Sequence, residues 1–146
     1  MFTIITFNET YRDDAIFCLL SAKDAIGRVP QLNSDMLDIQ KHYFDNNDMF
    51  WLAVDSNNRV VGMVGTKTDS NTDMWLKRLF IKPSFKRKGI GSALLTTAER
   101  YAKSKGILCL HTQFSYDFIE AALFYPSKGF IDETKDSSLH HMIKHL

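Results

Sequence analysis

A stretch near the middle of the chain, "IKPSFKRKGIGSALL" at residues 81–95, combines residue types that bind phosphate. Three consecutive cations at 86–88 precede Gly-Ile-Gly at 89–91, and a helix-like apolar pattern follows. The first turn of a helix has N–H groups without intrahelical partners and the positive end of the helix dipole, and both favour an anion. Glycines here leave the backbone open to a phosphate. The stretch predicts a phosphate socket, against the alternative of a tight turn beside a solvated run of charge.

Two common nucleotide motifs do not fit this spacing. A P-loop needs G-x-x-x-x-G-K-[ST], which the chain lacks. A dinucleotide fingerprint needs a third glycine at position 94, which is Leu94. It also needs an acid about 20 residues further on, where the sequence reads Leu-His-Thr at 110–112. The predicted phosphate therefore belongs to another kind of ligand.

Three segments, in order, resemble the GCN5-related N-acetyltransferase (GNAT) superfamily. The glycine stretch and its preceding strand, "WLKRLFIKP", resemble the acyl-CoA-binding motif [RQ]-x-x-G-x-[GA], with Lys86 where Arg or Gln is usual. "AALFYPSKGF" at 121–130 resembles the later A-x-x-x-Y-x-x-x-G-F segment of the family, and "FWLAVDSNNRVVGMVG" at 50–65 resembles its central hairpin. Each motif alone is weak, but the three in this order and spacing form a specific pattern over residues 50–130.

The resemblance implies an acetyl-CoA-dependent N-acetyltransferase that uses acetyl-CoA as co-substrate. The acetyl group would pass to a primary amine of a small-molecule or amino-acid-like acceptor by direct attack in a ternary complex. Tyr125 would be the general acid for the leaving thiolate, and an N–H at or near Leu79 would stabilise the thioester oxygen. The residues implied for cofactor binding are Leu79, Phe80, Ile81, Lys86, Arg87, Lys88, Gly89, Ile90, Gly91, Ser92, Ala121, Phe124 and Tyr125. Two alternatives stay open: a protein or peptide N-acetyltransferase, and a non-catalytic acyl-CoA-binding module.

The sequence departs from the family near Tyr125. Many members have Asn seven residues earlier, where it binds the cofactor arm, and this chain has Phe118. Pro126 follows Tyr125 directly and predicts a helix end at that point. No general base is marked by the pattern: the candidates are His111, Asp73, Asp117 and Glu120, or a chain of water molecules. His140, His141 and His145 have no ligand spacing with a Cys or acidic partner, so we expect no metal.

The acceptor specificity is expected to lie in the segment between the first two helices. In the family the acceptor lies across the sheet from the cofactor, beside these helices. Here "GRVPQLNS" and "DMLDIQKHYF" occupy that place. Arg28 is a candidate for binding a carboxylate, and Asp35 or Asp38 for attracting a cationic amine, against the alternative of solvated helix faces.

Periodicity predicts the elements that must position these residues, in the order β-α-α-β-β-β-α-β-α-β-β. A strand at 2–7, helices at 10–27 and 34–44, and a hairpin of strands at 50–55 and 59–68 come first. A strand at 73–83, a helix at 92–105 and a strand at 107–114 follow. A short helix near Pro126 and a last pair of strands end the chain. The prediction is a single α/β (α+β) domain over 1–146, with a mixed, mostly antiparallel sheet of about six to seven strands and about four helices.

Composition limits the function classes further. The 146 residues carry a net charge of +1, so no global field would hold nucleic acid. Cys18 and Cys109 lie among apolar neighbours without a C-x-x-C pair, and we expect buried, reduced thiols. No secretion signal opens the sequence, and no apolar run reaches the roughly 20 residues of a membrane span. We expect a cytoplasmic protein without membrane contact. A homodimer is one expected assembly, since the family often forms them.

Overall fold

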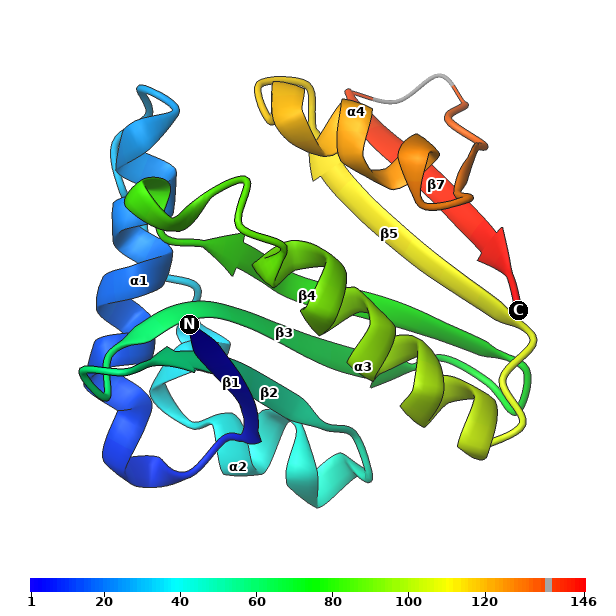
Figure 1. Cartoon of the computed structure of the whole chain (residues 1–146). Helices are drawn as coiled ribbons and strands as arrows, with labels where there is room; N and C mark the ends of the chain where they lie inside the picture. Colours follow the sequence, from blue (N-terminus) through cyan, green and yellow to red (C-terminus); the bar gives the residue numbers. More distant parts are fainter. Residues whose placement is uncertain (136–137) are drawn as a thin grey trace.

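A seven-stranded sheet forms the middle layer of the computed structural model, which describes residues 1–135 and 138–146 (Figure 1). The strands lie in the order β1-β2-β3-β4-β5-β7-β6, and every neighbouring pair is antiparallel except β4 and β5. The strands are β1 (Phe2–Thr6), β2 (Phe50–Asp55), β3 (Val60–Thr68), β4 (Asp73–Ile81), β5 (Cys109–Ser115), β6 (Ile131–Asp132) and β7 (Leu139–His145). The predicted mixed, mostly antiparallel α/β fold is confirmed.

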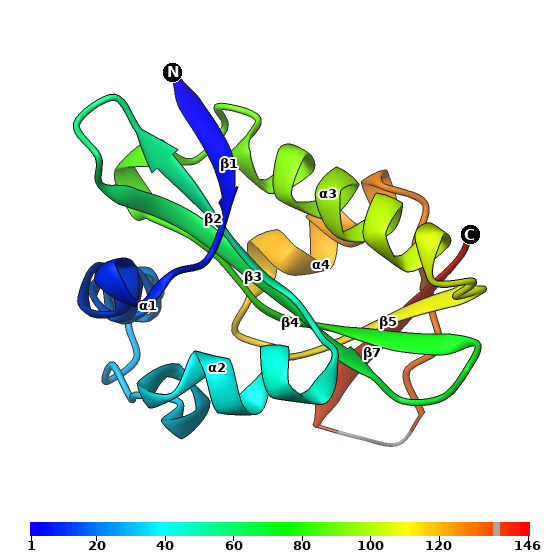
Figure 2. The same ribbon diagram turned by 90° about the horizontal axis from the view of Figure 1, so that it is seen from below.

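Helices cover both faces of this sheet (Figure 2). The described helices are α1 (Arg12–Ala25), α2 (Ile39–His42), α3 (Ile90–Ser104) and α4 (Ile119–Ser127). Two separate apolar clusters lie between the layers, one containing residues of α1 and α2 and the other residues of α3 and α4. No helix in the described part of the chain is long and apolar enough to cross a membrane.

Strand β2 shows how the sequence builds this arrangement. Successive side chains of a strand point to opposite faces. Trp51 and Ala53 accordingly join the cluster under α3, while Phe50, Leu52 and Val54 join the cluster under α1. All five are buried. A continuous apolar run, rather than an alternating one, therefore marks a central strand covered on both sides. Cys18 and Cys109 are free and buried, as expected.

The helix predicted at 34–44 is wrong, because three short pieces replace it. A 3-10 turn (Ser34–Leu37) precedes α2, and another (Phe44–Asn46) follows it. Asp38 separates the first turn from α2: its backbone leaves the helical region at φ −145° and ψ 76°, and its side chain accepts a hydrogen bond from the Lys41 N–H. An Asp that caps a helix cannot also continue one, since capping requires a non-helical backbone.

The other helix limits differ from prediction by a few residues. Residues 9–11 form a 3-10 turn in which the Asn8 side chain accepts a hydrogen bond from the Thr10 N–H, so α1 begins at Arg12, two residues after the predicted start. Helix α3 begins at Ile90, two residues before the predicted start. Helix α4 runs one residue past Pro126, which places Tyr125 in its last turn, as predicted.

Strands β4 and β5 diverge, and this feature positions the site. Their parallel pairing covers Asp73–Cys109, Met74–Leu110 and Trp75–His111 and then stops, although both strands continue. Figure 1 shows the two strands opening away from each other beyond that point. Helix α4 lies beyond the end of β5, beside the opening. The opening therefore has a sheet strand on each side and helix α4 at its end.

Candidate active site

The N-terminus of α3 presents unpaired backbone donors. The first intrahelical bond runs from the Ala93 N–H to the Gly89 carbonyl at 3.0 Å, so the N–H groups of Ile90, Gly91 and Ser92 precede the helical ladder. Gly89 lies at φ +83° with open space where a Cβ would stand, and no side chain caps the helix. The left-handed backbone, rather than lack of room, accounts for glycine at this position. The predicted donor set of the phosphate socket (residues 86–92) is thus brought together at one point.

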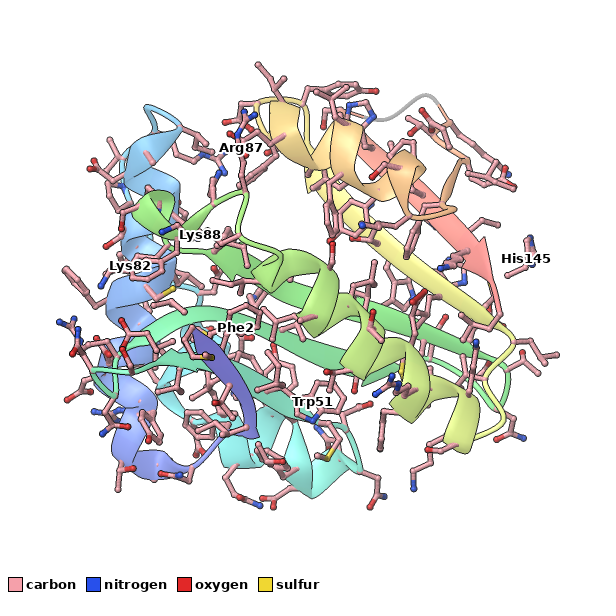
Figure 3. All side chains as sticks on the ribbon, in the orientation of Figure 1. Phe2, Trp51, Lys82, Arg87, Lys88 and His145 are labelled. Atoms are coloured by element: carbon pink, nitrogen blue, oxygen red, sulfur yellow. The ribbon has the colours of Figure 1, made fainter. Side chains whose placement is uncertain are left out.

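Cations surround this turn, but they are not equivalent. Lys86 Nζ lies 3.2 Å from the Glu120 carboxylate of α4, in a partly exposed ion pair. Arg87 and Lys88 are exposed, form no ion pair with any described residue, and stand at the turn before α3 in Figure 3. Two cations therefore remain available to an anion. Glu120, a predicted candidate base, is paired with Lys86 instead.

A cavity of about 190 Å³ opens between the diverging strands, and we call it the β4–β5 cleft. Its lining consists of Lys23, Arg28, Asn33, Leu76, Arg78, Leu79, Phe80, Thr112, Gln113, Phe114, Phe118, Ala121 and Tyr125. Of the predicted cofactor residues it brings together Leu79, Phe80, Ala121 and Tyr125. Ile81 and Phe124 do not line it; both lie near Gly91, at the base of the socket.

A β-bulge shapes one wall of this cleft. Strand pairing joins Gly65 to Lys77 and then Met63 to Phe80, so Arg78 and Leu79 together face one residue of β3. Arg78 lies at φ +56°, a left-handed conformation that is uncommon for a side chain other than glycine. Leu79 has no partner in the regular register on either side, because the β4–β5 pairing has already ended. A bulge of this kind turns peptide groups out of the ladder and re-aims side chains.

Tyr125 is held rigidly at the opposite wall. Its side chain is buried, and its ring contacts those of Phe114, Phe124 and Phe130 at centroid distances of 5.5, 5.3 and 5.1 Å. Burial raises the pKa of Tyr125 to about 12, opposed in part by a hydrogen bond from the Thr112 side chain. The phenol is therefore fully protonated at neutral pH. A buried, protonated hydroxyl on a cavity wall is suited to donating a hydrogen bond.

Phe118 occupies the position at which the family pattern has Asn. It lies in the cleft lining, tilted against Phe80 at 6.0 Å, with the Arg28 guanidinium 5.3 Å from its ring centre. Arg28 also pairs with Asp117 at 3.3 Å, so that candidate base has a partner too. An apolar ring and a cation thus replace an amide at this end of the cleft.

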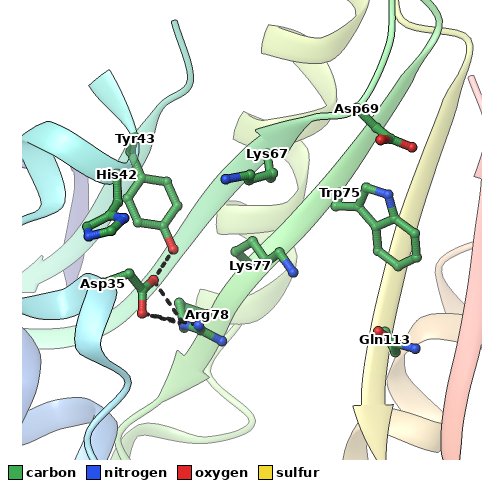
Figure 4. A pocket seen from close by; sticks show the side chains of 9 residues that line it. All are labelled: Asp35, His42, Tyr43, Lys67, Asp69, Trp75, Lys77, Arg78 and Gln113. Atoms are coloured by element: carbon green, nitrogen blue, oxygen red, sulfur yellow. Dashed lines mark hydrogen bonds and ion pairs between the residues drawn. The ribbon is translucent and has the colours of Figure 1, made fainter. Parts of the chain in front are cut away.

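A second cavity, of about 410 Å³, adjoins the cleft on the α2 side of the sheet, and we call it the polar pocket (Figure 4). Its lining is Asp35, His42, Tyr43, Lys67, Asp69, Trp75, Lys77, Arg78 and Gln113. Arg78 and Gln113 also line the β4–β5 cleft, so the two cavities share a boundary. No sequence motif marked this pocket, since its lining comes from distant segments whose residues carry no recognisable spacing.

Arg78 is fixed at this boundary by Asp35. Its Nε lies 3.1 and 3.2 Å from the two carboxylate oxygens, and Nη2 lies 3.1 Å from one of them. The Tyr43 hydroxyl donates to the same carboxylate. Burial alone would raise the pKa of Asp35, but the hydrogen bonds from Arg78 and Tyr43 lower it below its ordinary value. Asp35, predicted as a contact for a cationic amine, thus holds Arg78, while Asp38 caps α2.

The predicted base His111 lies in a hydrogen-bonded cluster beside Trp75. Its Nε2 is 2.6 Å from the Asp73 carboxylate, its Nδ1 is 3.0 Å from His141 Nε2, and its ring stacks on Trp75 at 4.8 Å. Among the described residues, Asp73, Cys109 and His111 bring possible metal ligands within 4.8 Å of one another. The short contact between Asp73 and His111 is that of a hydrogen bond, which accounts for their proximity. Neither His111 nor Asp73 lines the cleft or the pocket.

The sequence and the fold were compared with those of known proteins. Residues 12–130 match the model of the acetyltransferase (GNAT) family. A spermidine N(1)-acetyltransferase from Thermoplasma acidophilum is 36% identical over 97 residues, which cover 64% of this chain and 57% of that protein. The chain spans about half the length of the curated relatives it matches.

Solved structures share the fold over the full chain. A GNAT-family acetyltransferase from Staphylococcus aureus Mu50 superposes with a TM-score of 0.88 at 23% identity, covering 100% of this chain and 99% of that one. The PaiA N-acetyltransferase from Thermoplasma acidophilum, solved in complex with coenzyme A, gives 0.82 at 22% identity, covering 100% and 99%. Taken together with the family match, the glycine turn at α3 and the diverging strands, these findings show that the chain belongs to the GNAT acetyltransferase family.

Proposed function

We propose that this chain, acting as one domain over residues 1–146, transfers the acetyl group of acetyl-CoA to a primary amine. The observation that carries the proposal is the β4–β5 cleft, where the bulge at Arg78 and Leu79 and the hydroxyl-bearing Tyr125 line one cavity. An acyl transfer needs a donor for the carbonyl oxygen and a partner for the leaving group. The two walls of the cleft supply one candidate for each.

Coenzyme A fits the features beside the cleft. Its pyrophosphate would lie on the N–H groups of Ile90, Gly91 and Ser92, with the exposed Arg87 and Lys88 near the outer phosphates. This arrangement relies on backbone donors, which explains how Lys86 can replace the usual Arg or Gln and still pair with Glu120. The pantetheine arm would follow Leu79 and Phe80 into the cleft, with Ala121 and Phe124 near the α4 end.

The proposed reaction is a direct attack of the amine on the thioester. The lone pair of a neutral amine forms a bond to the thioester carbonyl carbon, and the oxygen takes up negative charge. The Leu79 N–H, outside the regular ladder, is the proposed donor to that oxygen. The carbon–sulfur bond then breaks, the sulfur leaves with the electron pair, and the Tyr125 hydroxyl donates a hydrogen bond to it. The amine proton is lost as the product amide forms.

The charges in the cleft favour a neutral amine. Its described lining contains three cations, Lys23, Arg28 and Arg78, and no acid or histidine. Arg28 and Arg78 pair with Asp117 and Asp35 outside this lining, while Lys23 forms no ion pair with any described residue. Nearby positive charge disfavours an ammonium and lowers its pKa, which is near 10.4 for an ordinary lysine amine. The proton that the acceptor ammonium loses would pass to water at the boundary with the polar pocket, since no described carboxylate or imidazole lines the cleft.

The acceptor would reach the thioester through the polar pocket. Arg78 and Gln113 border both cavities, so a molecule seated in the pocket can present its amine at that boundary. A pocket of about 410 Å³ holds a small molecule or an amino-acid-like group. A small amine is therefore the proposed acceptor class, ahead of a protein lysine or peptide N-terminus.

Release of the coenzyme A thiol with a panel of amines tests this proposal. The panel should contain amino acids, small aliphatic amines, polyamines and short peptides, each with acetyl-CoA. Acetylated product should appear in equal amount to the free thiol. A protein that binds coenzyme A but releases no thiol above background with any amine would instead be a non-catalytic acyl-CoA-binding module.

A further inference from the structure

Two lysines in the polar pocket have no counter-ion. Lys67 and Lys77 form no ion pair with any described residue, and Figure 4 shows them between Tyr43 and Trp75. The acids of the pocket do not neutralise them. Asp35 is held by Arg78 and Tyr43, and Asp69 forms no ion pair with either lysine.

The sheet register places the two lysines on one face. Gly65 stands opposite Lys77, and Lys67 stands opposite Trp75, so the lysines are diagonal neighbours on β3 and β4. Diagonal neighbours have their Cα atoms about 7 to 8 Å apart, well within reach of one another's long side chains. Two like charges in this relation repel, and the repulsion is relieved when an anion lies between them.

The free-energy cost of these two unpaired charges falls mainly on Lys77, which is less exposed than Lys67. Lys77 is half-buried, with its Nζ 5.8 Å from the centre of the Trp75 ring. Burial lowers its pKa most, and the positive charges of Arg78 and Lys67 lower it further. Asp35 opposes this only weakly, because its charge is engaged by Arg78. A half-buried cation without an anionic partner loses part of its hydration, and a bound anion would offset that loss.

The position of the lysines fixes which part of an acceptor they meet. The amine must approach the boundary at Arg78 and Gln113, where the pocket joins the cleft. Lys67 and Lys77 lie in the same pocket but outside the cleft lining, so they face the remainder of the acceptor. Trp75, whose ring stacks on His111 of β5, offers an apolar wall of the pocket for a carbon chain.

We propose that the acceptor carries a carboxylate as well as its amine, and that Lys67 and Lys77 bind that carboxylate. This inference rests on the proposed acetyl transfer and narrows its substrate class to amino-acid-like molecules. It also sets this chain apart from a polyamine acetyltransferase, because a second ammonium of a polyamine would lie against two lysines. The bidentate geometry of an arginine is not needed to bind this carboxylate, since two lysines can bind it as two point charges.

The test compares matched acceptors in matched variants. The acceptors are an α-amino acid, its carboxamide, a dipeptide with a free carboxylate, and spermidine. The variants are Lys67→Met, Lys77→Met and Lys77→Arg, with Lys103→Met as the control, since Lys103 is exposed in the last turn of α3. The measured quantity is the kcat/KM of the acid divided by that of the amide. Differences in amine pKa between the two acceptors cancel when this ratio is compared across variants.

The wild type should prefer the acid, and Lys77→Met should reduce that preference about tenfold, as expected for loss of one charge-assisted contact. Lys77→Arg should keep most of it, and Lys103→Met all of it. Comparison of the free amino acid with the dipeptide shows whether the bound carboxylate belongs to a single amino acid or to the end of a peptide. A preference for spermidine, or a ratio unchanged in both methionine variants, would overturn the inference while leaving acetyl transfer intact.

A binding measurement separates this inference from the proposed activity. Calorimetric titration of the amino acid and its amide into the protein saturated with coenzyme A needs no turnover. Weaker binding of the acid to Lys77→Met, with unchanged binding of the amide, would support the carboxylate site even if no thiol release were seen. Equal affinity of the wild type for acid and amide would refute it.

Discussion

Replacing Tyr125 with Phe removes one hydroxyl from the wall of the β4–β5 cleft and leaves the ring in place. The ring keeps its contacts with Phe114, Phe124 and Phe130. The cost to folding is the hydrogen bond with Thr112, about 1 kcal/mol. The variant should therefore fold, and any larger effect on turnover reports the reaction rather than stability.

The pKa of Tyr125 sets the expected size of the kinetic effect. Burial raises it to about 12, while an ordinary thiol has a pKa of about 8.5. Complete proton transfer from this phenol to the thiolate would be uphill by about 5 kcal/mol. We therefore expect a hydrogen bond to the departing sulfur, worth about 2 to 3 kcal/mol. Loss of that bond lowers kcat about a hundredfold, with little change in coenzyme A affinity.

Steady-state thiol release as a function of pH measures this prediction. The rate should rise with pH as the acceptor amine loses its proton, and no alkaline decline below about pH 10 should come from Tyr125. Tyr101→Phe is the matched control, because the Tyr101 hydroxyl donates to the Asn47 carbonyl at 2.9 Å, away from both cavities. Wild-type kcat in Tyr125→Phe would remove this residue from the mechanism. An alkaline decline that disappears in the variant would show that Tyr125 ionises far below pH 12.

Three further predictions concern the socket and the pocket. Gly89→Glu should weaken coenzyme A binding at least tenfold, since a carboxylate would repel phosphate and the residue must adopt φ +83°; unchanged affinity by calorimetry would refute the socket. Asp35→Asn should cost about 2 kcal/mol of unfolding free energy at neutral pH. Because the folded-state pKa of Asp35 is lowered, its contribution is present above the unfolded pKa and is lost as pH falls through the folded value. The difference between wild type and variant in urea denaturation should therefore shrink below about pH 4, and a constant difference would contradict the pairing with Arg78. Gly65→Ala should cost about 2 kcal/mol in the same assay, because its Cβ would lie 2.7 Å from the rings of Tyr43 and Phe50; equal stability would show that these rings can move.

The strands and their order along the chain could be anticipated because their signals are local. Runs of apolar residues bounded by turns predicted β2 and β3 closely, and the glycines at 89 and 91 predicted the turn before α3. These features depend on residues near one another in sequence.

The missed features depend on contacts between distant residues. Nothing in "WLKRLF" indicates that Arg78 adopts a positive φ, since Arg has no intrinsic preference for it; the bulge and the bidentate contact with Asp35 hold it there. The pairing of Lys86 with Glu120 spans 34 residues and likewise has no sequence signal. The prediction of one helix at 34–44 was wrong for a local reason, because it placed Asp38 inside a helix, whereas Asp38 caps α2.

In the proposed function, the bulge in β4 and the turn before α3 bind one and the same molecule. Amide chemical shifts of the isotope-labelled protein, followed during titration with a thioether analogue of acetyl-CoA, test it most directly. The amide of Leu79 and those of Ile90, Gly91 and Ser92 should shift together and saturate at the same ligand concentration. Saturation of the α3 amides with no shift at Leu79 would contradict it, because the acetyl group would then lie outside the β4–β5 cleft.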